Sequence, residues 1–361
     1  MADRRAARLA ALLDTFVGDV DGLLVSSLPN IRYLTGFSGS NALLFLSRGE
    51  RWLITDFRYE TQVRAEVGEL AAIRIEQVSL WDGLWAILPA IQGIKVLGFE
   101  AAHLSHRDFQ RLLESGSRWQ WRPKSNLVED LRESKDADEV QLIRHAAAIA
   151  VSALGRTVGG IRAGLTELQV AGILEHALRD EGSEGFPFPT IVASGPRAAL
   201  PHARTSSRAI QTGDFVLLDF GAEYQGYCSD ITRTFVIGTA SVEQREAYDV
   251  VREANAVART GIRPGMTGQD ADALARRYIE RHGYGEAFGH GLGHGLGLEV
   301  HEAPRLARTA TGRLPVGAVV TIEPGIYRPE WGGIRIEDDV HLSADGPELL
   351  TDYPRELIEV P

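Results

Sequence analysis

A motif that occurs twice restricts the fold more than any other feature, because it indicates a duplicated unit. Gly160–Thr166 (GIRAGLT) recurs 101 residues later as Gly261–Thr267 (GIRPGMT). The threonine that ends each copy is a suitable N-cap for a following helix. Gly182 and Gly283, at equal distances from the two motifs, are suitable C-caps for those helices. Chance recurrence of a common turn would not explain the matched helix ends, so we predict a duplicated α/β unit.

Each copy continues into a predicted β-hairpin that carries acidic residues on both arms. In the first, Phe215–Leu218 and Ile231–Ile237 favour strands and enclose a polar turn. A turn centred immediately after Tyr224 would place Asp219 directly opposite Asp230. Opposed carboxylates repel each other, so this pairing makes sense if a cation lies between them. Capping of the turn by the aspartates is the alternative.

The second hairpin repeats this pattern with glutamates. A turn centred on Glu330 would place Glu323 opposite Glu337. Arg335 precedes Glu337 by two residues, so both side chains would lie on one face of the strand. Two pairs of opposed acids in two copies of one unit are hard to explain by folding alone. We therefore predict a metal site between the hairpins.

Between the hairpins lies the glycine-rich segment Phe288–Glu302, which contains His290, His294 and His301. Glycine disfavours a helix, so His290 and His294 are not the helical zinc pair of an H-E-x-x-H protease. We expect one of the three histidines to bind metal and the others to line a cleft; solvated loop histidines are the alternative. His202 follows a proline, and its local sequence favours a structural role.

Four carboxylates and one imidazole form a mixed set of oxygen and nitrogen donors. Such a set suits two divalent ions, such as Mn²⁺, Co²⁺, Fe²⁺ or Zn²⁺, with carboxylates bridging them. Two ions about 3.5–4 Å apart can hold and deprotonate a bridging water and stabilise the oxyanion that it forms.

In order and spacing these motifs resemble the prolidase and aminopeptidase P group of pita-bread metallopeptidases. The resemblance covers roughly residues 124–361 and rests on LLDFG, SDITRT, GHGLGHGLGLEVHE, TIEPGIY and GIRIED. It implies two divalent metal ions, with manganese expected and cobalt, zinc or iron as alternatives. The implied ligands, of which Asp230 and Glu337 would touch both ions, are Asp219, Asp230, His294, Glu323 and Glu337.

The same resemblance implies roles around the metals. His301 would steady the tetrahedral intermediate, and Arg335 would hold the network of the cleft. His202 and His290 would contact the substrate and leaving group, which replaces the local interpretation of His202. The implied catalytic residues are His202, His301, Glu323 and Arg335, and the implied substrate-binding residues are His202, His290 and His301.

Residues 1–123 are predicted to form a separate small α/β domain. Tyr33–Asn41 (YLTGFSGSN) and Ile54–Tyr59 (ITDFRY) resemble the creatinase-type N-terminal domain of aminopeptidases P. The polar stretch 122–136 marks the boundary, which leaves 124–361 for the catalytic domain. The predicted fold class is therefore α/β (α+β), a creatinase-like N-terminal domain followed by a pseudo-duplicated pita-bread domain.

Composition excludes several classes of protein. The net charge of -11 argues against a nucleic-acid surface. No segment approaches the length of apolar sequence that a membrane span or secretion signal needs. The single cysteine, Cys228, allows no intrachain disulfide, so we expect a reducing, cytoplasmic location. The resemblance adds the expectation of a homodimer.

The implied substrates are proline-containing peptides. A bond before proline is a tertiary amide without an N–H, and His290 and His301 are expected to form the pocket that accepts it. The N-terminal motifs favour a Xaa-Pro aminopeptidase (aminopeptidase P) over a Xaa-Pro dipeptidase (prolidase). A dipeptidase would need a cation for the proline carboxylate, for which Arg305 and Arg308 are candidates.

Three more remote alternatives share the fold. Creatinase works without metal, and a non-catalytic binding module would typically have lost ligands; the complete ligand set argues against both. Methionine aminopeptidase usually lacks this N-terminal domain and the His301-Glu302 context.

Overall fold

The computed structural model describes residues 4–16 and 18–361, which divide into two compact units after Arg132. Among these described residues, no helix is long and apolar enough to cross a membrane.

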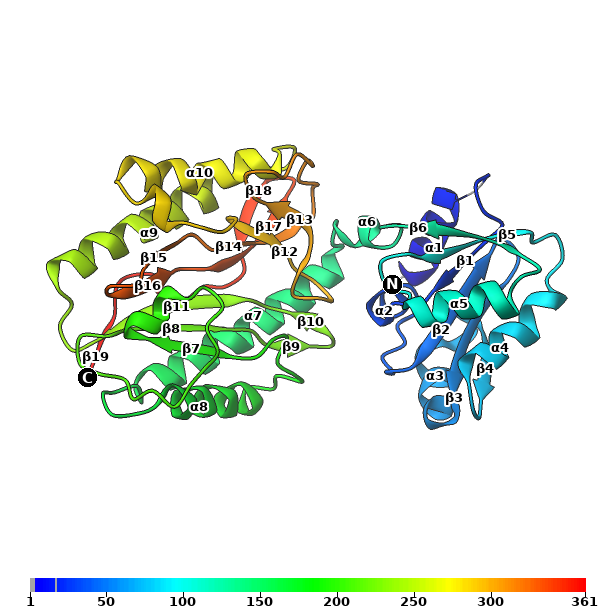
Figure 1. Ribbon diagram of the computed structural model, residues 1–361, viewed down its shortest axis with the longest axis horizontal. Helices are drawn as coiled ribbons and strands as arrows, with labels where there is room; N and C mark the ends of the chain where they lie inside the picture. The colour runs from blue at the N-terminus through cyan, green and yellow to red at the C-terminus, as the bar shows by residue number, and fades with distance from the viewer. Residues whose placement is uncertain (1–3, 17) are drawn as a thin grey trace. The chain divides into compact units, whose positions relative to one another are not determined.

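The N-terminal unit is a six-stranded mixed sheet with helices packed on it (Figure 1). Its core combines the buried faces of the central strands with aromatic side chains such as Phe45, Phe99 and Trp119. In sheet order the strands are β4 (Ala72–Glu76), β3 (Arg51–Asp56), β2 (Ala42–Ser47), β1 (Gly22–Val25), β5 (Val96–Glu100) and β6 (Gln120–Lys124). The helices are α1 (Arg4–Phe16), α2 (Leu28–Thr35), α3 (Glu60–Val67), α4 (Leu80–Ile87), α5 (His106–Ser115) and α6 (Glu129–Arg132).

The predicted domain boundary after residue 123 is wrong, because it falls inside β6. This strand pairs with β5 over its whole length, and Pro123 is opposite Phe99. β6 is the last strand of the sheet, the position where a proline is tolerated because its missing N–H faces no partner strand. The polar composition of this stretch reflects an exposed sheet edge, and the compact units divide nine residues later, after α6.

The C-terminal unit contains two sheets that lie between two pairs of helices (Figure 1). The first sheet runs β19 (Glu359–Val360), β11 (Ile231–Ile237), β8 (Phe215–Phe220), β7 (Ile191–Ser194) and packs against α7 (Ala137–Val158) and α8 (Glu167–Asp180). The second runs β13 (Glu302–Leu306), β12 (Gly293–Gly295), β14 (Val319–Ile322), β17 (Asp338–Ser343), β18 (Gly346–Leu349) and packs against α9 (Val242–Gly261) and α10 (Gly268–Arg281). Two ribbons, β9 (Glu223–Tyr224) with β10 (Tyr227–Cys228) and β15 (Gly325–Arg328) with β16 (Gly332–Arg335), complete the hairpins.

The predicted duplication is confirmed. Thr166 and Thr267 are the N-caps of α8 and α10, and each closes a capping box with the residue three positions on. Each threonine also forms an isolated antiparallel bridge to the loop that leads into the next hairpin. Gly182 and Gly283 follow these helices with φ of 100° and 84°, a left-handed conformation that strongly favours glycine.

Candidate metal centre

The first hairpin places its two aspartates on one face, but not directly opposite each other. Asp219 pairs with Thr232, so the predicted pairing with Asp230 is wrong by two residues. The turn is centred on Gln225 and Gly226, whose φ angles of 46° and 76° are those of tight hairpin turns with two positive-φ residues. Because side chains alternate with a period of two, the shift leaves both aspartates on the same face as diagonal neighbours.

The second hairpin has the predicted register. Gly325 pairs with Arg335 on one side of the glutamates, and Ile322 pairs with Asp338 on the other. Both ladders are centred on Glu330, so Glu323 and Glu337 lie opposite each other between them.

His294 reaches this face because glycines flank it. A Cβ on Gly293 would lie 2.1 Å from the carbonyl oxygen of Thr321, and one on Gly295 would lie 2.1 Å from that of Ala303. Only glycine allows the strand β12 to approach its neighbours so closely. His294 therefore lies on a short strand, which agrees with the prediction that this glycine-rich segment is not helical.

Three candidate ligands converge. One ligand atom from each of Asp230, His294 and Glu337 lies within 4.8 Å of the others. The Nε2 atom of His294 is 3.8 Å from Asp230 Oδ2 and 3.6 Å from Glu323 Oε1. His294 Nδ1 donates to the carbonyl of Gly295 at 3.0 Å, which leaves Nε2 as the free donor atom for a metal.

The electrostatics of the cluster favour a bound cation. Burial, together with the charges of Glu337 and Asp219, raises the pKa of Asp230 well above its usual value. Burial also raises the pKa of Glu323 to about 8 and lowers that of His294 to about 4. Asp230 Oδ1 is buried and has no hydrogen-bond partner within the described ranges. Several buried acids, an unpaired oxygen and a neutral imidazole are a donor set that fits divalent ions.

Asp219 is held by Arg335, which is 3% exposed and forms an ion pair with it. Arg335 also donates from Nε to Thr232 Oγ1 at 3.0 Å and from Nη1 to the Tyr327 hydroxyl at 2.9 Å. Thr232 Oγ1 in turn donates to Glu337 Oε2 at 2.6 Å. Arg335 thus links the two hairpins through their acidic residues.

Tyr327 extends this network to His290, and sequence reasoning missed it. His290 Nδ1 faces the carbonyl of Gly291 at 2.8 Å and must donate to it, so Nε2 accepts from the Tyr327 hydroxyl, also at 2.8 Å. Burial, followed by the charge of Arg335, lowers the pKa of His290 to about 4, in agreement with a neutral ring. Strand alternation could have identified Tyr327, because it lies two residues from Gly325, the partner of Arg335.

Removal of the Tyr327 hydroxyl tests this connection. Tyr327→Phe should lower kcat/KM about 10- to 100-fold, because a hydrogen bond to a charged group is worth about 1.5–3 kcal/mol. Tyr224→Phe, which removes a hydroxyl from the ribbon of the other hairpin, is the matched control and should leave kcat/KM unchanged. Steady-state kinetics that show no difference between the two variants would contradict the assigned connection.

The other predicted histidines are exposed at this site. The ring of His301 stands edge-on to that of His294, with centroids 4.4 Å apart. His202 lies in the loop after the 3-10 helix Gly195–Ala199, and its neighbour Pro201 accepts a hydrogen bond from Arg335 through its carbonyl. The exposure of His202 argues against the structural role that its local sequence favoured.

An open cleft of about 1360 Å³ adjoins the site and shares His290 and Tyr327 with it. Tyr284, Phe288 and Trp331 supply aromatic surface to its lining. Of the two arginines considered as carboxylate captors, Arg308 lines the cleft and lies 3.6 Å from Glu280. The other, Arg305, is exposed, and its backbone is the register partner of His294 where β13 pairs with β12.

Comparison with known proteins places this geometry in a family. Residues 141–344 match metallopeptidase family M24, and residues 5–134 match the creatinase/prolidase N-terminal domain. A Xaa-Pro dipeptidase of Pyrococcus horikoshii is 38% identical over 94% of this chain and 95% of its own length. The structure of a Xaa-Pro dipeptidase from Bacillus anthracis is 41% identical, with a TM-score of 0.94 over 99% of both chains. That of an X-Pro aminopeptidase from Thermotoga maritima is 38% identical, with a TM-score of 0.91 over 98% of this chain and 99% of the other.

Proposed function

From the premise that the chain belongs to metallopeptidase family M24 and is a metal-dependent peptidase, we propose that it hydrolyses Xaa-Pro dipeptides. The observation that carries the metal-dependent part of this proposal is that ligand atoms of Asp230, His294 and Glu337 lie within 4.8 Å of one another. The dipeptide part is supported by the resemblance to relatives named as Xaa-Pro dipeptidases. The sequence-based preference for an aminopeptidase P rested on N-terminal motifs. Relatives named as dipeptidases match this chain over nearly its whole length, N-terminal unit included, so those motifs do not separate the two activities.

We assign five residues to two divalent ions, with manganese as the proposed metal: Asp219, Asp230, His294, Glu323 and Glu337. When bound, such ions activate a water and polarise the carbonyl of the scissile bond. Asp230 and Glu337 would be central ligands, because both are buried in the cluster and Asp230 has an oxygen without a partner in the described part of the chain.

Glu323, in addition to its role as a ligand, and the nearby histidines would bind the substrate and move protons. Glu323 would accept a proton from the attacking water and return it to the proline nitrogen, the task of a general base. His301, exposed beside His294, would donate a hydrogen bond to the carbonyl oxygen as negative charge develops there. His290 would face the proline ring as a neutral imidazole, with its orientation fixed by Tyr327 and Gly291.

A second candidate is a Xaa-Pro aminopeptidase acting on longer peptides. The cleft favours it, because about 1360 Å³ exceeds the roughly 300–1,000 Å³ of typical small-molecule sites. The resemblance to the X-Pro aminopeptidase of Thermotoga maritima gives further support.

Substrate length decides between the two activities. A dipeptidase should cleave Xaa-Pro with a kcat/KM at least about tenfold above that for Xaa-Pro-Yaa-Zaa, a difference of about 1.4 kcal/mol in transition-state binding. The amide Xaa-Pro-NH₂ is the matched control, because it removes the carboxylate charge without lengthening the chain. A preference for the tetrapeptide would establish the aminopeptidase, and equal cleavage of Xaa-Ala peptides would reject proline selectivity.

We also propose that the protein acts as a homodimer in a reducing compartment, where the buried Cys228 remains a thiol. Light scattering of the purified chain at several concentrations tests the first part of this proposal.

A further inference from the structure

The two strands that carry Glu323 and Glu337 separate where the glutamates lie. They pair on both sides, through Ile322 with Asp338 and through Gly325 with Arg335. At the glutamates, the backbone N–H groups bond to other elements: that of Glu323 donates to the carbonyl of Leu292, and that of Glu337 to the carbonyl of Thr232. Between the two ladders, one long backbone bond joins the arms, from the Ile336 N–H to the carbonyl of Pro324 at 3.4 Å. Backbone pairing is therefore weak where the spacing of the two carboxylates has to be set.

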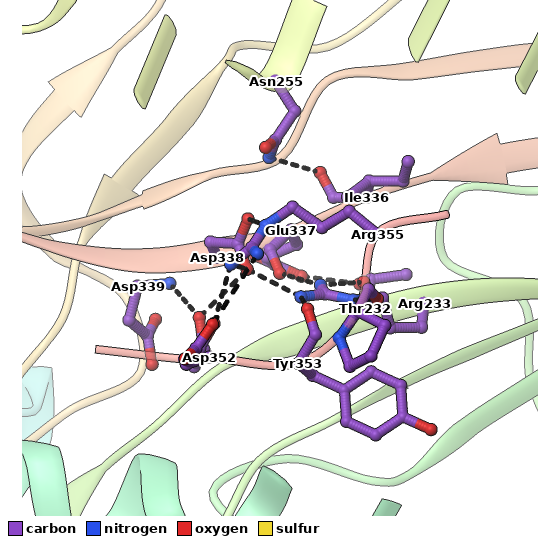
Figure 2. A network of polar contacts seen from close by, with 12 residues as sticks. Thr232, Arg233, Asn255, Ile336, Glu337, Asp338, Asp339, Asp352, Tyr353 and Arg355 are labelled. Atoms are coloured by element: carbon purple, nitrogen blue, oxygen red, sulfur yellow. Dashed lines mark hydrogen bonds and ion pairs between the residues drawn. The ribbon is translucent and has the colours of Figure 1, made fainter. Parts of the chain in front are cut away.

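One side chain spans this weakly paired stretch. Asn255 of α9 is fully buried, and its Nδ2 donates to the carbonyls of Ile322 and Ile336, at 3.1 Å each. These carbonyls belong to the residues that immediately precede Glu323 and Glu337. Figure 2 shows the bond from Asn255 to Ile336 beside Glu337. A single amide group thus connects the backbones of both glutamate-bearing strands.

A hydrogen bond to the Asn255 amide oxygen fixes the orientation of this amide. Arg259 donates from Nε to Asn255 Oδ1 at 2.7 Å, so the amide nitrogen must face the two carbonyls. Arg259 also lies 3.5 Å from Asp338, the residue next to Glu337. Arg233 and Arg355 bind the same aspartate, which is fully buried, with contacts of 2.8–2.9 Å (Figure 2). These arginines anchor the strand on the face opposite the candidate ligands.

We infer that Asn255 is a positioning residue of the metal centre, which sets the spacing of Glu323 and Glu337 without touching metal or substrate. This inference rests on the proposed function, because it concerns the two glutamates as metal ligands. Groups that orient ligands in this way typically contribute about 10- to 100-fold to metal affinity. A merely structural role would instead lower the stability of the protein and leave its metal affinity unchanged.

The experiment compares Mn²⁺ binding by the metal-free wild type and by metal-free Asn255→Leu, measured by titration calorimetry. Leucine is close to asparagine in size and favours a helix, but it cannot donate to the two carbonyls. We expect a Kd for Mn²⁺ at least about tenfold higher in the variant. The thermal stabilisation that Mn²⁺ gives at a fixed concentration should shrink accordingly.

The matched control is Tyr248→Phe. Tyr248 lies on the same helix, is 1% exposed, and donates a hydrogen bond to the carbonyl of Glu356, away from the glutamates. This variant should lose some stability and keep the wild-type Kd. If Asn255→Leu does not fold, Arg259→Met replaces it, because Arg259 is partly exposed. This variant removes the hydrogen bond that orients the Asn255 amide. We expect it to raise the Kd for Mn²⁺ by a smaller factor.

The inference would be overturned if Asn255→Leu, or Arg259→Met in its place, had the same Kd for Mn²⁺ as the Tyr248→Phe control. The assignment of the metal ligands would not be affected by that result. A wild-type protein that binds no Mn²⁺ would overturn the proposed function, and the inference with it.

Discussion

Asp230→Asn is expected to lose metal binding and to lower kcat/KM at least about 1000-fold, because metal activation is worth several kcal/mol. The substitution keeps the size of the side chain and the backbone hydrogen bond from Asp230 to Asp339. It removes the buried charge that Glu337 and Asp219 already disfavour. The fold should therefore persist, which circular dichroism and thermal unfolding can check, while elemental analysis measures the metal.

Asp339→Asn is the matched control for this experiment. Asp339 is also fully buried beside the cluster, but its Oδ2 accepts the N–H of Asp230 and it is no proposed ligand. Asparagine can still accept that bond, so metal content and activity should change far less. A metal-replete, fully active Asp230→Asn enzyme would refute the assignment of Asp230 as a ligand.

The second large effect concerns His301. His301→Ala should lower kcat about 100- to 1000-fold, the usual result of removing one donor to a developing oxyanion. It should retain its metal, because His301 is exposed and stands beside His294, whose Nε2 faces Asp230 and Glu323. His294→Ala is the comparison, and it should lose both metal and turnover. Equal metal loss in the two variants would show that their roles are reversed.

The hairpins show how far the sequence determines this site. The glutamate register was predictable because a proline and two glycines surround Glu330 and mark the turn. The aspartate register was not, because Gln225 adopts a positive φ that its residue type rarely takes. The resulting error of two residues kept the correct face, since side chains alternate with the same period.

Residues that act through tertiary contacts were not predictable in this way. Asn255 is one polar residue in the middle of a long helix, and nothing in its local sequence indicates that it bonds to two carbonyls far along the chain. The same holds for the hydrogen bond between Tyr327 and His290, which depends on how strand β15 meets the glycine-rich segment. The domain boundary was misplaced for a related reason, since β6 is recognisable as a strand only through its pairing with β5.

Metal content measured together with peptidase activity tests whether the chain is a metal-dependent Xaa-Pro peptidase. Purified protein treated with a chelator should be inactive, and activity should return with Mn²⁺ as about two ions bind per chain. The substrate should be a Xaa-Pro dipeptide, and the metal should be counted by elemental analysis of the reactivated enzyme. Full activity in chelated protein that holds no metal would show that hydrolysis does not depend on bound metal.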